Sequence, residues 1–420
     1  MSGGVLLNSD GELVGLHGRG ERDEQSSKGE LVMKTGVNQG VPITYYNLFT
    51  RGSPVVIAKT TATTSDDYLV QAKASQLKKG REQAVIKLTT QALALRSSVK
   101  GYFLRAFAKY RLKDTQGAIA DYSKAIEINP QYVPAIYNRA NAKKTLEDYQ
   151  GAIADHNKAI EINPQYAAAF NNRGTNKFLL GDHQGAIADY SKAIEINPKH
   201  AIAYYNRGKA KSDLEDYQGV IPDYNTAIEL DPQFAEPYNG RGSAKHRLKD
   251  MEGAIADYNK AIELDPKHAI AYANRGNIKK NLGDNQGAIV DYTSAIELNP
   301  QDVYAYDMRG FAKMNLGDYQ GAIADANKAI SIDPKYASAY NNRGWSKYLQ
   351  GDFQNALKDA NKALAITPND GATLDTRGLA KHALGQDISA CKDLKRASYL
   401  GYQGSSQYLQ SEEGTWCRDM

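Results

Sequence analysis

A unit of 34 residues is written eight times in succession, without a gap, between Val99 and Asp370. A proline near the end of each copy marks the register, at Pro130, Pro164, Pro198, Pro232, Pro266, Pro300, Pro334 and Pro368. A fixed period of this length is typical of a stacked repeat protein, in which each unit buries its apolar face only against its neighbours. The period therefore constrains the fold class more strongly than any local propensity does.

Small and large residues recur at fixed positions of the unit, which we number from Val99 as position 1. Position 27 is alanine in every copy, position 8 is glycine or alanine, and position 4 is a large residue such as Tyr204. Small side chains let two helix backbones approach while large ones fill the remaining volume. We therefore predict a helical hairpin, with helix A at about positions 2 to 14 and helix B at about positions 18 to 30. Gly-Asp pairs such as Gly181-Asp182 would end helix A and cap helix B.

This order of aromatic, small, alanine and proline residues resembles the tetratricopeptide repeat (TPR) family. The resemblance implies an all-α solenoid, a right-handed superhelix of helix-turn-helix repeats. Eight regular repeats would occupy residues 99–370, with a degenerate repeat at 65–98, a ninth, capping repeat at 371–404 and a tail at 405–420. The sequence departs from the family at position 7, often leucine there and arginine here, and at position 11, often tyrosine there and lysine here.

One charged set recurs in all nine units from Val99 onward. It comprises Arg at position 7, Lys at position 11 and Asp at position 23, as in Arg105, Lys109 and Asp121. The two cations share a stripe of helix A because they are four residues apart, and the aspartate lies on helix B. The set could form an anion-binding stripe or a salt-bridge brace that makes a ladder between hairpins. We favour the brace, since every pair of cations comes with its own carboxylate and repeated pairs can act as a network.

In the TPR family, positions 2, 5, 6, 9, 12 and 13 of helix A line the concave face and meet the ligand. Position 6 holds asparagine in five copies: Asn138, Asn172, Asn206, Asn274 and Asn342. An amide side chain carries a donor and an acceptor, so it can pair with a peptide backbone of any sequence. The row is similar to the asparagine ladder in the TPR region of O-linked N-acetylglucosamine transferase. The alternative is that asparagine only tolerates a solvated helix face, and the sequence leaves both interpretations open.

Aromatic residues accompany the asparagines on helix A. They are Tyr137 and Tyr205 at position 5, Phe103, Phe107 and Tyr110 in the first regular repeat, and Phe311, Trp345 and Tyr348 in the seventh and eighth. Such residues are common anchors of recognition surfaces, although they could equally pack against the ends of the array. From these groove positions we predict an adaptor that binds other proteins by holding an extended peptide segment.

The first 50 residues lack a helical period. Residues 5–7, the turn signal Asp10-Gly11 and residues 12–17 predict a β-hairpin. The stretch SGGVLLNSDGELVGLHG resembles the segment that follows the nucleophile in trypsin-like serine proteases, which places Ser2 at the nucleophile position. In that family the histidine and the aspartate precede the serine, so the Ser2 hydroxyl would lack its proton acceptor here. We predict an incomplete, inactive protease remnant at 1–50 and a linker at 51–64. A TPR-fused trypsin-like endopeptidase is the alternative function.

Composition and short motifs limit the partners, metals and cofactors that this chain is expected to bind. A net charge of +4 gives no reason to expect a nucleic-acid or membrane partner. Only Cys391 and Cys417 occur, without metal-ligand spacing, so neither a disulfide framework nor a metal site is predicted. No phosphate loop or nucleotide fingerprint predicts a cofactor. His156 stands at position 24, a tyrosine position in other copies, and is expected to replace that ring in the core. Without a membrane-length apolar run or a secretory signal, the chain as written is expected to be cytoplasmic, unless an export signal lies upstream of Met1.

Overall fold

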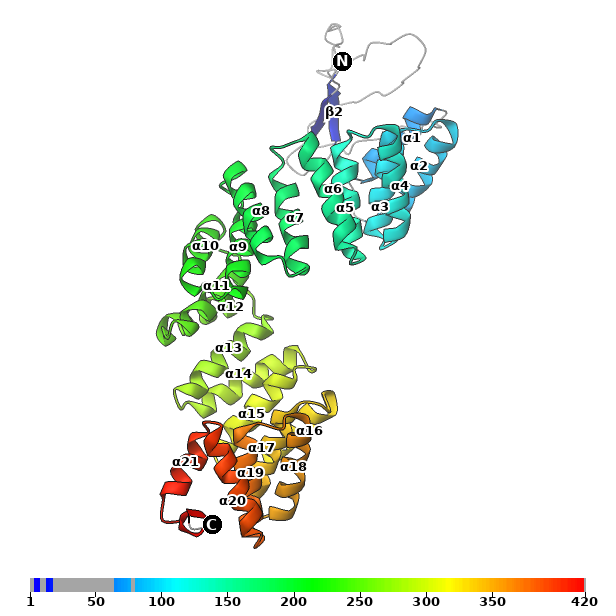
Figure 1. Cartoon of the computed structure of the whole chain (residues 1–420). Coiled ribbons are helices and arrows are strands. Elements are labelled where there is room, and N and C mark those ends of the chain that lie inside the picture. Colours follow the sequence, from blue (N-terminus) through cyan, green and yellow to red (C-terminus); the bar gives the residue numbers. More distant parts are fainter. Residues whose placement is uncertain (1–3, 8–12, 18–63, 77–79, 419–420) are drawn as a thin grey trace, which may run out of the picture. The chain divides into compact units, whose positions relative to one another are not determined.

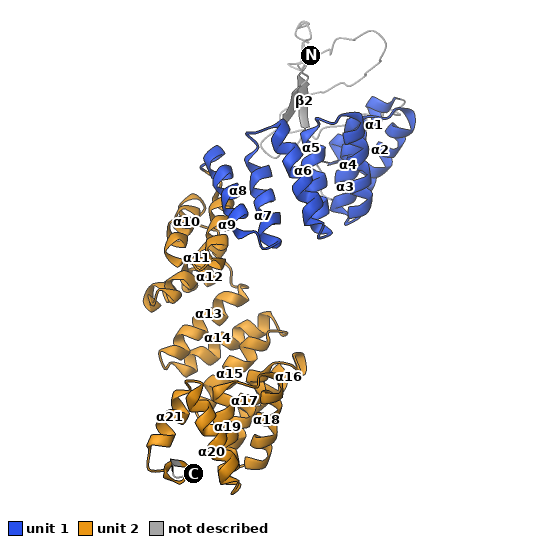
Figure 2. Cartoon of the chain, viewed as in Figure 1, with its two compact units in different colours: residues 1–198 blue, residues 199–420 orange. Residues whose placement is uncertain are grey.

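The computed structural model describes residues 4–7, 13–17, 64–76 and 80–418 of the 420-residue chain. In this part of the chain the regular structure is helical, apart from one pair of strands near the N-terminus (Figure 1). The chain divides into two compact units, residues 1–198 and residues 199–420 (Figure 2). We call them unit 1 and unit 2 and describe each by itself.

The two strands of unit 1 are β1 (Gly4–Leu7) and β2 (Leu13–His17). They pair antiparallel, with Gly4 opposite His17 and Leu6 opposite Gly15. The predicted turn between them, the linker up to residue 63 and most of the protease-like segment, including Ser2, lie outside the described residues. The resemblance of residues 1–50 to a protease therefore stays a prediction, and two short strands do not distinguish it from any other hairpin.

Within each unit, every described helix packs on the next along the chain. In unit 1 they are α1 (Ser65–Gln76), α2 (Glu82–Leu95), α3 (Val99–Arg111), α4 (Thr115–Ile128), α5 (Val133–Thr145), α6 (Tyr149–Ile162), α7 (Ala167–Leu179) and α8 (His183–Ile196). In unit 2 they are α9 (Ala201–Asp213), α10 (Tyr217–Leu230), α11 (Ala235–Arg247), α12 (Met251–Leu264), α13 (Ala269–Asn281), α14 (Asn285–Leu298), α15 (Val303–Asn315), α16 (Tyr319–Ile332), α17 (Ala337–Leu349), α18 (Phe353–Ile366), α19 (Gly371–Ala383), α20 (Asp387–Tyr399), α21 (Gln403–Gln410) and α22 (Thr415–Arg418).

Each 34-residue unit forms the predicted hairpin, with both helices starting one position earlier than expected. The turn geometry is as predicted: Gly181 has a left-handed φ of 82°, and the Asp182 carboxylate accepts a hydrogen bond from the Gly185 N–H at 2.8 Å. Where position 15 is not glycine the chain still takes a left-handed conformation, at φ 66° for Lys113 and 61° for Glu215. The packing of the hairpin therefore imposes the turn, and glycine only makes it less strained.

The repeated small residues lie where the helices touch. The position 27 alanines are all fully buried: Ala125, Ala159, Ala193, Ala227, Ala261, Ala295, Ala329, Ala363 and Ala397. A position 4 ring, Tyr306, packs in one cluster with two of them. The glycine at position 8 has a different partner than the sequence suggested, because it lies against position 24 of helix B. A Cβ added to Gly208 would lie 2.6 Å from the ring of Tyr224, so only the smallest side chains fit.

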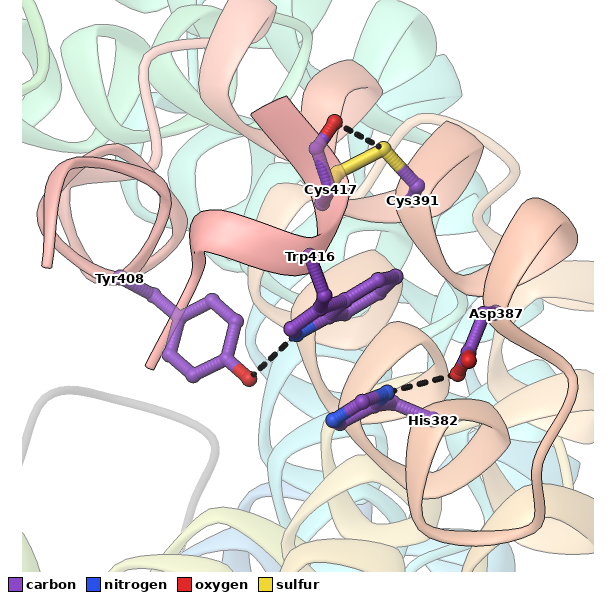
Figure 3. Close-up of a disulfide and its surroundings, with 6 residues drawn as sticks. All are labelled: His382, Asp387, Cys391, Tyr408, Trp416 and Cys417. Atoms are coloured by element: carbon purple, nitrogen blue, oxygen red, sulfur yellow. Dashed lines mark hydrogen bonds and ion pairs between the residues drawn. A yellow bond between two sulfur atoms is a disulfide. The ribbon is translucent and has the colours of Figure 1, made fainter. Parts of the chain in front are cut away.

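The C-terminal end of unit 2 contains a disulfide, although the sequence indicated no disulfide framework. Cys391 on α20 and Cys417 on α22 form a disulfide, with their Cα atoms 5.3 Å apart (Figure 3). Both residues are almost fully buried. The bond holds α22 where the indole of Trp416 stacks on the His382 imidazole, with ring centroids 4.0 Å apart and an interplanar angle of 3°. The spacing could not predict the bond, since it requires the tail to fold back over α20.

Reduction of this disulfide is expected to release Trp416. In a Trp345→Phe background, which leaves Trp416 as the only tryptophan, reduction or Cys417→Ser should shift its fluorescence to the red and increase its accessibility to acrylamide. The reason is that the disulfide anchors this short helix, and with it the stack on His382 and the 3.2 Å hydrogen bond from Trp416 Nε1–H to Tyr408 Oη. An emission spectrum that does not change on reduction would contradict the tethering role.

Candidate functional site

The repeated Arg, Lys and Asp residues form a brace inside each hairpin from α3 onward, and their ion pairs do not form the predicted ladder between hairpins. In the repeat of α11 and α12, Arg241 donates from Nη2 and Nε to the two carboxylate oxygens of Asp257, at 2.6 and 2.9 Å. Lys245 Nζ lies 2.8 Å from Asp257 Oδ2. The same triad is present in all nine units from Val99 onward. The carboxylates are buried, so the brace hypothesis is confirmed.

The same arginine also reaches the preceding repeat. Arg241 Nη1 donates to Asn225 Oδ1 on α10 at 2.6 Å, and its guanidinium lies over the ring of Tyr238, 5.6 Å from the centroid. Further arginines make the equivalent bond to Ser123, Asn157, Asn259, Thr293, Asn327 or Asn361. Each guanidinium is thus occupied by its own aspartate, and most are also occupied by a neighbouring helix B or by an aromatic face. These cations are engaged in structure and do not form an anion-binding stripe.

The predicted asparagines do lie on helix A, and most of them donate to the preceding helix A. Asn172 Nδ2 donates to Tyr137 Oη at 2.8 Å, and Asn342 Nδ2 donates to Asp307 Oδ1 at 2.7 Å. Asn138 Nδ2 instead donates to a carbonyl of its own helix. Asn206 occupies the equivalent place on α9 and is half-buried. The amide donors of Asn138, Asn172, Asn274 and Asn342 are therefore used within the protein, which the sequence interpretation did not foresee.

Asn274 illustrates what remains for a ligand. Its Nδ2 donates to Asn239 Oδ1 at 3.1 Å. Its own Oδ1 accepts no hydrogen bond from the residues that the structure describes. A carbonyl oxygen with two lone pairs can accept a backbone N–H from outside. Asn274 thus offers an acceptor, and not the donor and acceptor pair that the sequence predicted.

The predicted aromatic residues of unit 1 and α9 are largely engaged in packing. Tyr137 contacts the rings of His156 and Tyr166, at centroid distances of 5.6 and 4.9 Å. Tyr205 contacts Tyr224 and Phe234 in the same way. These rings join helix A to helix B of their own repeat. The sequence could not separate this role from ligand contact, because both place an aromatic ring on the same helix.

The aromatic residues of the first regular repeat are packed similarly. Phe103 lies 5.8 Å from Tyr122 and 5.5 Å from Tyr132, measured between ring centroids. The hydroxyl of Tyr110 is 2.8 Å from Thr145 Oγ1 of the next helix A. Phe107 lines a small hollow together with residues of α1 and α2. Phe103 and Tyr110 therefore brace neighbouring elements at this end of unit 1.

The helix A positions of α13, α15 and α17 form a continuous surface in unit 2, since each of these helices contacts the next. We call it the helix-A face of unit 2, formed by Ile270, Asn274, Asn277, Lys280, Tyr304, Met308, Phe311, Asn342, Trp345 and Tyr348. Trp345 and Tyr348 stack at 5.0 Å with an interplanar angle of 13°. Ile270 is 62% exposed and Tyr304 is 43% exposed. Apolar side chains therefore remain accessible on this face beside polar ones.

A polar cluster crosses this face between α15 and α17. The Asp307 carboxylate is 1% exposed and accepts hydrogen bonds from Ser338 Oγ at 2.6 Å and from Asn342 Nδ2 at 2.7 Å. Burial raises the pKa of Asp307, and the Ser338, Asn342 and Tyr336 donors oppose that rise. Across the face, burial lowers the pKa of Lys280 on α13. Titratable groups whose pKa values are shifted in this way, on one accessible surface, mark a candidate binding site.

Sequence comparison identifies the repeat. Family models described as TPR repeat match residues 177–214, 246–283 and 310–351. Models described as tetratricopeptide repeat match residues 99–132, 133–166, 201–234, 269–302 and 337–370. Together the matches cover more than half of the chain. The chain belongs to the tetratricopeptide repeat family. A search of curated proteins found no match to this TPR protein.

Solved structures similar to this TPR protein are about a quarter identical to it over the parts that align. MamA is 25% identical, covering 42% of this chain and 95% of its own, with a TM-score of 0.36. YrrB, titled a TPR protein with an unusual peptide-binding site, is 26% identical, covering 47% and 97%, with a TM-score of 0.40. A TPR protein from Parabacteroides merdae ATCC 43184 is 23% identical, covering 59% and 98%, with a TM-score of 0.46.

Lys280 and Asp307 were missed by the sequence analysis, which looked for residues that recur. Both are exceptions within the TPR array: position 12 is lysine only in Lys144 and Lys280, and position 5 is aspartate only in Asp307 and Asp375. Departures from the repeat pattern at groove positions would have found them. In the described residues, no group of three or more His, Cys, Asp or Glu side chains could hold a metal ion. None of the described helices is both long and apolar enough to cross a bilayer.

Proposed function

We propose that this protein is a non-enzymatic scaffold that binds an extended segment of another protein on the helix-A face of unit 2. TPR arrays are generally protein-interaction scaffolds, and this face carries exposed apolar side chains next to unoccupied acceptors. An extended segment needs partners for its backbone N–H groups and apolar surface for its side chains. Asn138, Asn172 and Asn206 remain candidate ligand residues of the other helices A.

The observation that carries the proposal is the hydrogen bonding of the Asn274 side chain. Its amide group is oriented by the bond to Asn239, and its Oδ1 is left to accept from a ligand. Ile270, one turn earlier on α13, and Tyr304 on α15 are exposed beside it. A fixed acceptor between apolar side chains suits a peptide backbone better than it suits a compact folded surface.

The test is peptide binding by the full chain. Peptides selected on an array should bind wild type in solution, and Asn274→Ala should weaken them about fivefold, the effect of losing one hydrogen bond. The matched control is Asn355→Gly on α18, which restores the glycine that other repeats carry at that position, and it should bind as wild type does. Fluorescence anisotropy measures both. A wild-type chain that selects no peptide, or an Asn274→Ala variant with unchanged affinity, would overturn the proposal.

A further inference from the structure

Lys280 holds a positive charge on the helix-A face of unit 2 without an oxygen partner. Its ammonium lies 3.7 Å from the thioether of Met308 and 5.3 Å from the centroid of the Phe311 ring, both on α15. In the described part of the chain, no oxygen accepts a hydrogen bond from this ammonium. Its neighbour Lys279 differs, because its Nζ lies 2.9 Å from Asp291 in the brace. An ammonium has three donors, and a thioether is only a weak acceptor for one of them.

The surroundings of Lys280 make that charge available to a ligand. The side chain is half-buried, so part of its hydration is already lost and a new charged partner gains more than it would in open water. The face of the Phe311 ring attracts the cation electrostatically, but it does not accept hydrogen bonds from the N–H donors. The site is therefore prepared for an oxygen acceptor that the protein itself does not provide.

Asp307 does not fill this role, although it attracts Lys280 electrostatically. Its two oxygens are occupied by the Ser338 hydroxyl and the Asn342 amide, and the side chain is 1% exposed. No ion pair within 4.0 Å joins it to Lys280 among the described residues. A ligand carboxylate would thus contact the ammonium directly, because Asp307 is already hydrogen-bonded to Ser338 and Asn342.

We propose that Lys280, Met308 and Phe311 form a subsite for an acidic side chain of the bound segment, with apolar residues of that segment flanking it. This inference rests on the proposed function, because it names the class of peptide that the helix-A face of unit 2 would select. A single cation suits a singly charged carboxylate, whereas a phosphate group is usually bound by several cations or a forked guanidinium. Phe311, Tyr304 and Ile270 provide the apolar surface on either side.

The experiment compares two sets of short fluorescein-labelled peptides that differ only at a central Glu or Gln, with apolar flanks. Wild-type full chain is expected to bind the Glu set about tenfold more tightly, the effect of one charge-assisted hydrogen bond. Lys280→Met keeps the length of the side chain and should bind both sets equally. Lys267→Met removes the same charge from an exposed site just before α13 and should keep the preference. Circular dichroism checks that both variants are folded.

The outcomes separate this inference from the proposed function. Equal binding of Glu and Gln peptides by wild type, or a Glu preference that survives in Lys280→Met, would overturn the subsite and leave peptide binding intact. If wild type binds neither set and no other peptide, both proposals would be overturned. A phosphoserine set that binds more tightly than the Glu set, and loses that advantage in Lys280→Met, would replace the carboxylate assignment with a phosphate.

Discussion

Asp257→Ala is expected to lower the free energy of unfolding of unit 2 by about 3 kcal/mol. Asp257 is 4% exposed and holds both Arg241 and Lys245, so its removal leaves two cations facing each other without a counter-charge. This value is the lower end of the destabilisation expected when one partner of a buried ion pair is removed. The lower end applies because the Arg241 and Lys245 side chains are 19% and 24% exposed, so water can partly hydrate them. Urea unfolding of the full chain, followed by circular dichroism, measures the loss.

The same helix provides the control for this prediction. Glu263 on α12 also binds a lysine, with Lys260 Nζ at 2.6 Å, but its side chain is 67% exposed. Glu263→Ala should therefore change stability little, since surface pairs contribute little. If the two alanine variants unfold alike, burial of the triad has no energetic role. If Asp257→Ala keeps its stability but binds inorganic anions, the stripe interpretation would return in place of the brace.

The hairpins could be predicted because the same residue pattern recurs in every copy. Position 27 is alanine in each copy, and a position that only alanine occupies must lie at a close helix contact. The brace was predictable for a similar reason, because three charged residues always occur together. Averaging over copies removes the local noise that usually blurs helix boundaries, and the errors here were about one residue.

The site was less predictable because it depends on what one copy places against the next. The partner of each asparagine is decided at position 5 of the preceding repeat, where Tyr137, Asn239 and Asp307 differ. A pattern common to all copies carries no information on such pairs. The repeat pattern does not predict the disulfide either, because Cys391 and Cys417 come together only through the path of the tail. The repeats therefore predict the scaffold, and their exceptions hold the candidate site.

The stability of unit 1 is expected to fall by about 3 kcal/mol between pH 6.5 and pH 4 because of one buried histidine. His156 takes the place of the position 24 tyrosine, as predicted, and is fully buried on α6. Neither ring nitrogen has a hydrogen-bond partner among the described residues. Burial lowers the pKa of His156 to about 4. The unfolded chain binds the proton at higher pH than the folded one, so this contribution is complete above pH 6.5 and is lost as the pH falls through 4.

His156→Phe isolates this effect from the carboxylates that also titrate in acid. Phenylalanine fills the same site, between Tyr137 and the neighbouring helices, without a group that can be protonated. The difference in urea midpoint between wild type and His156→Phe should therefore widen as the pH is lowered from 7 to 4. The other titrating groups are common to both chains, so they do not contribute to this difference. Parallel pH profiles would therefore mean that His156 is protonated equally in the folded and unfolded states. Its site would then be more hydrated than its burial indicates.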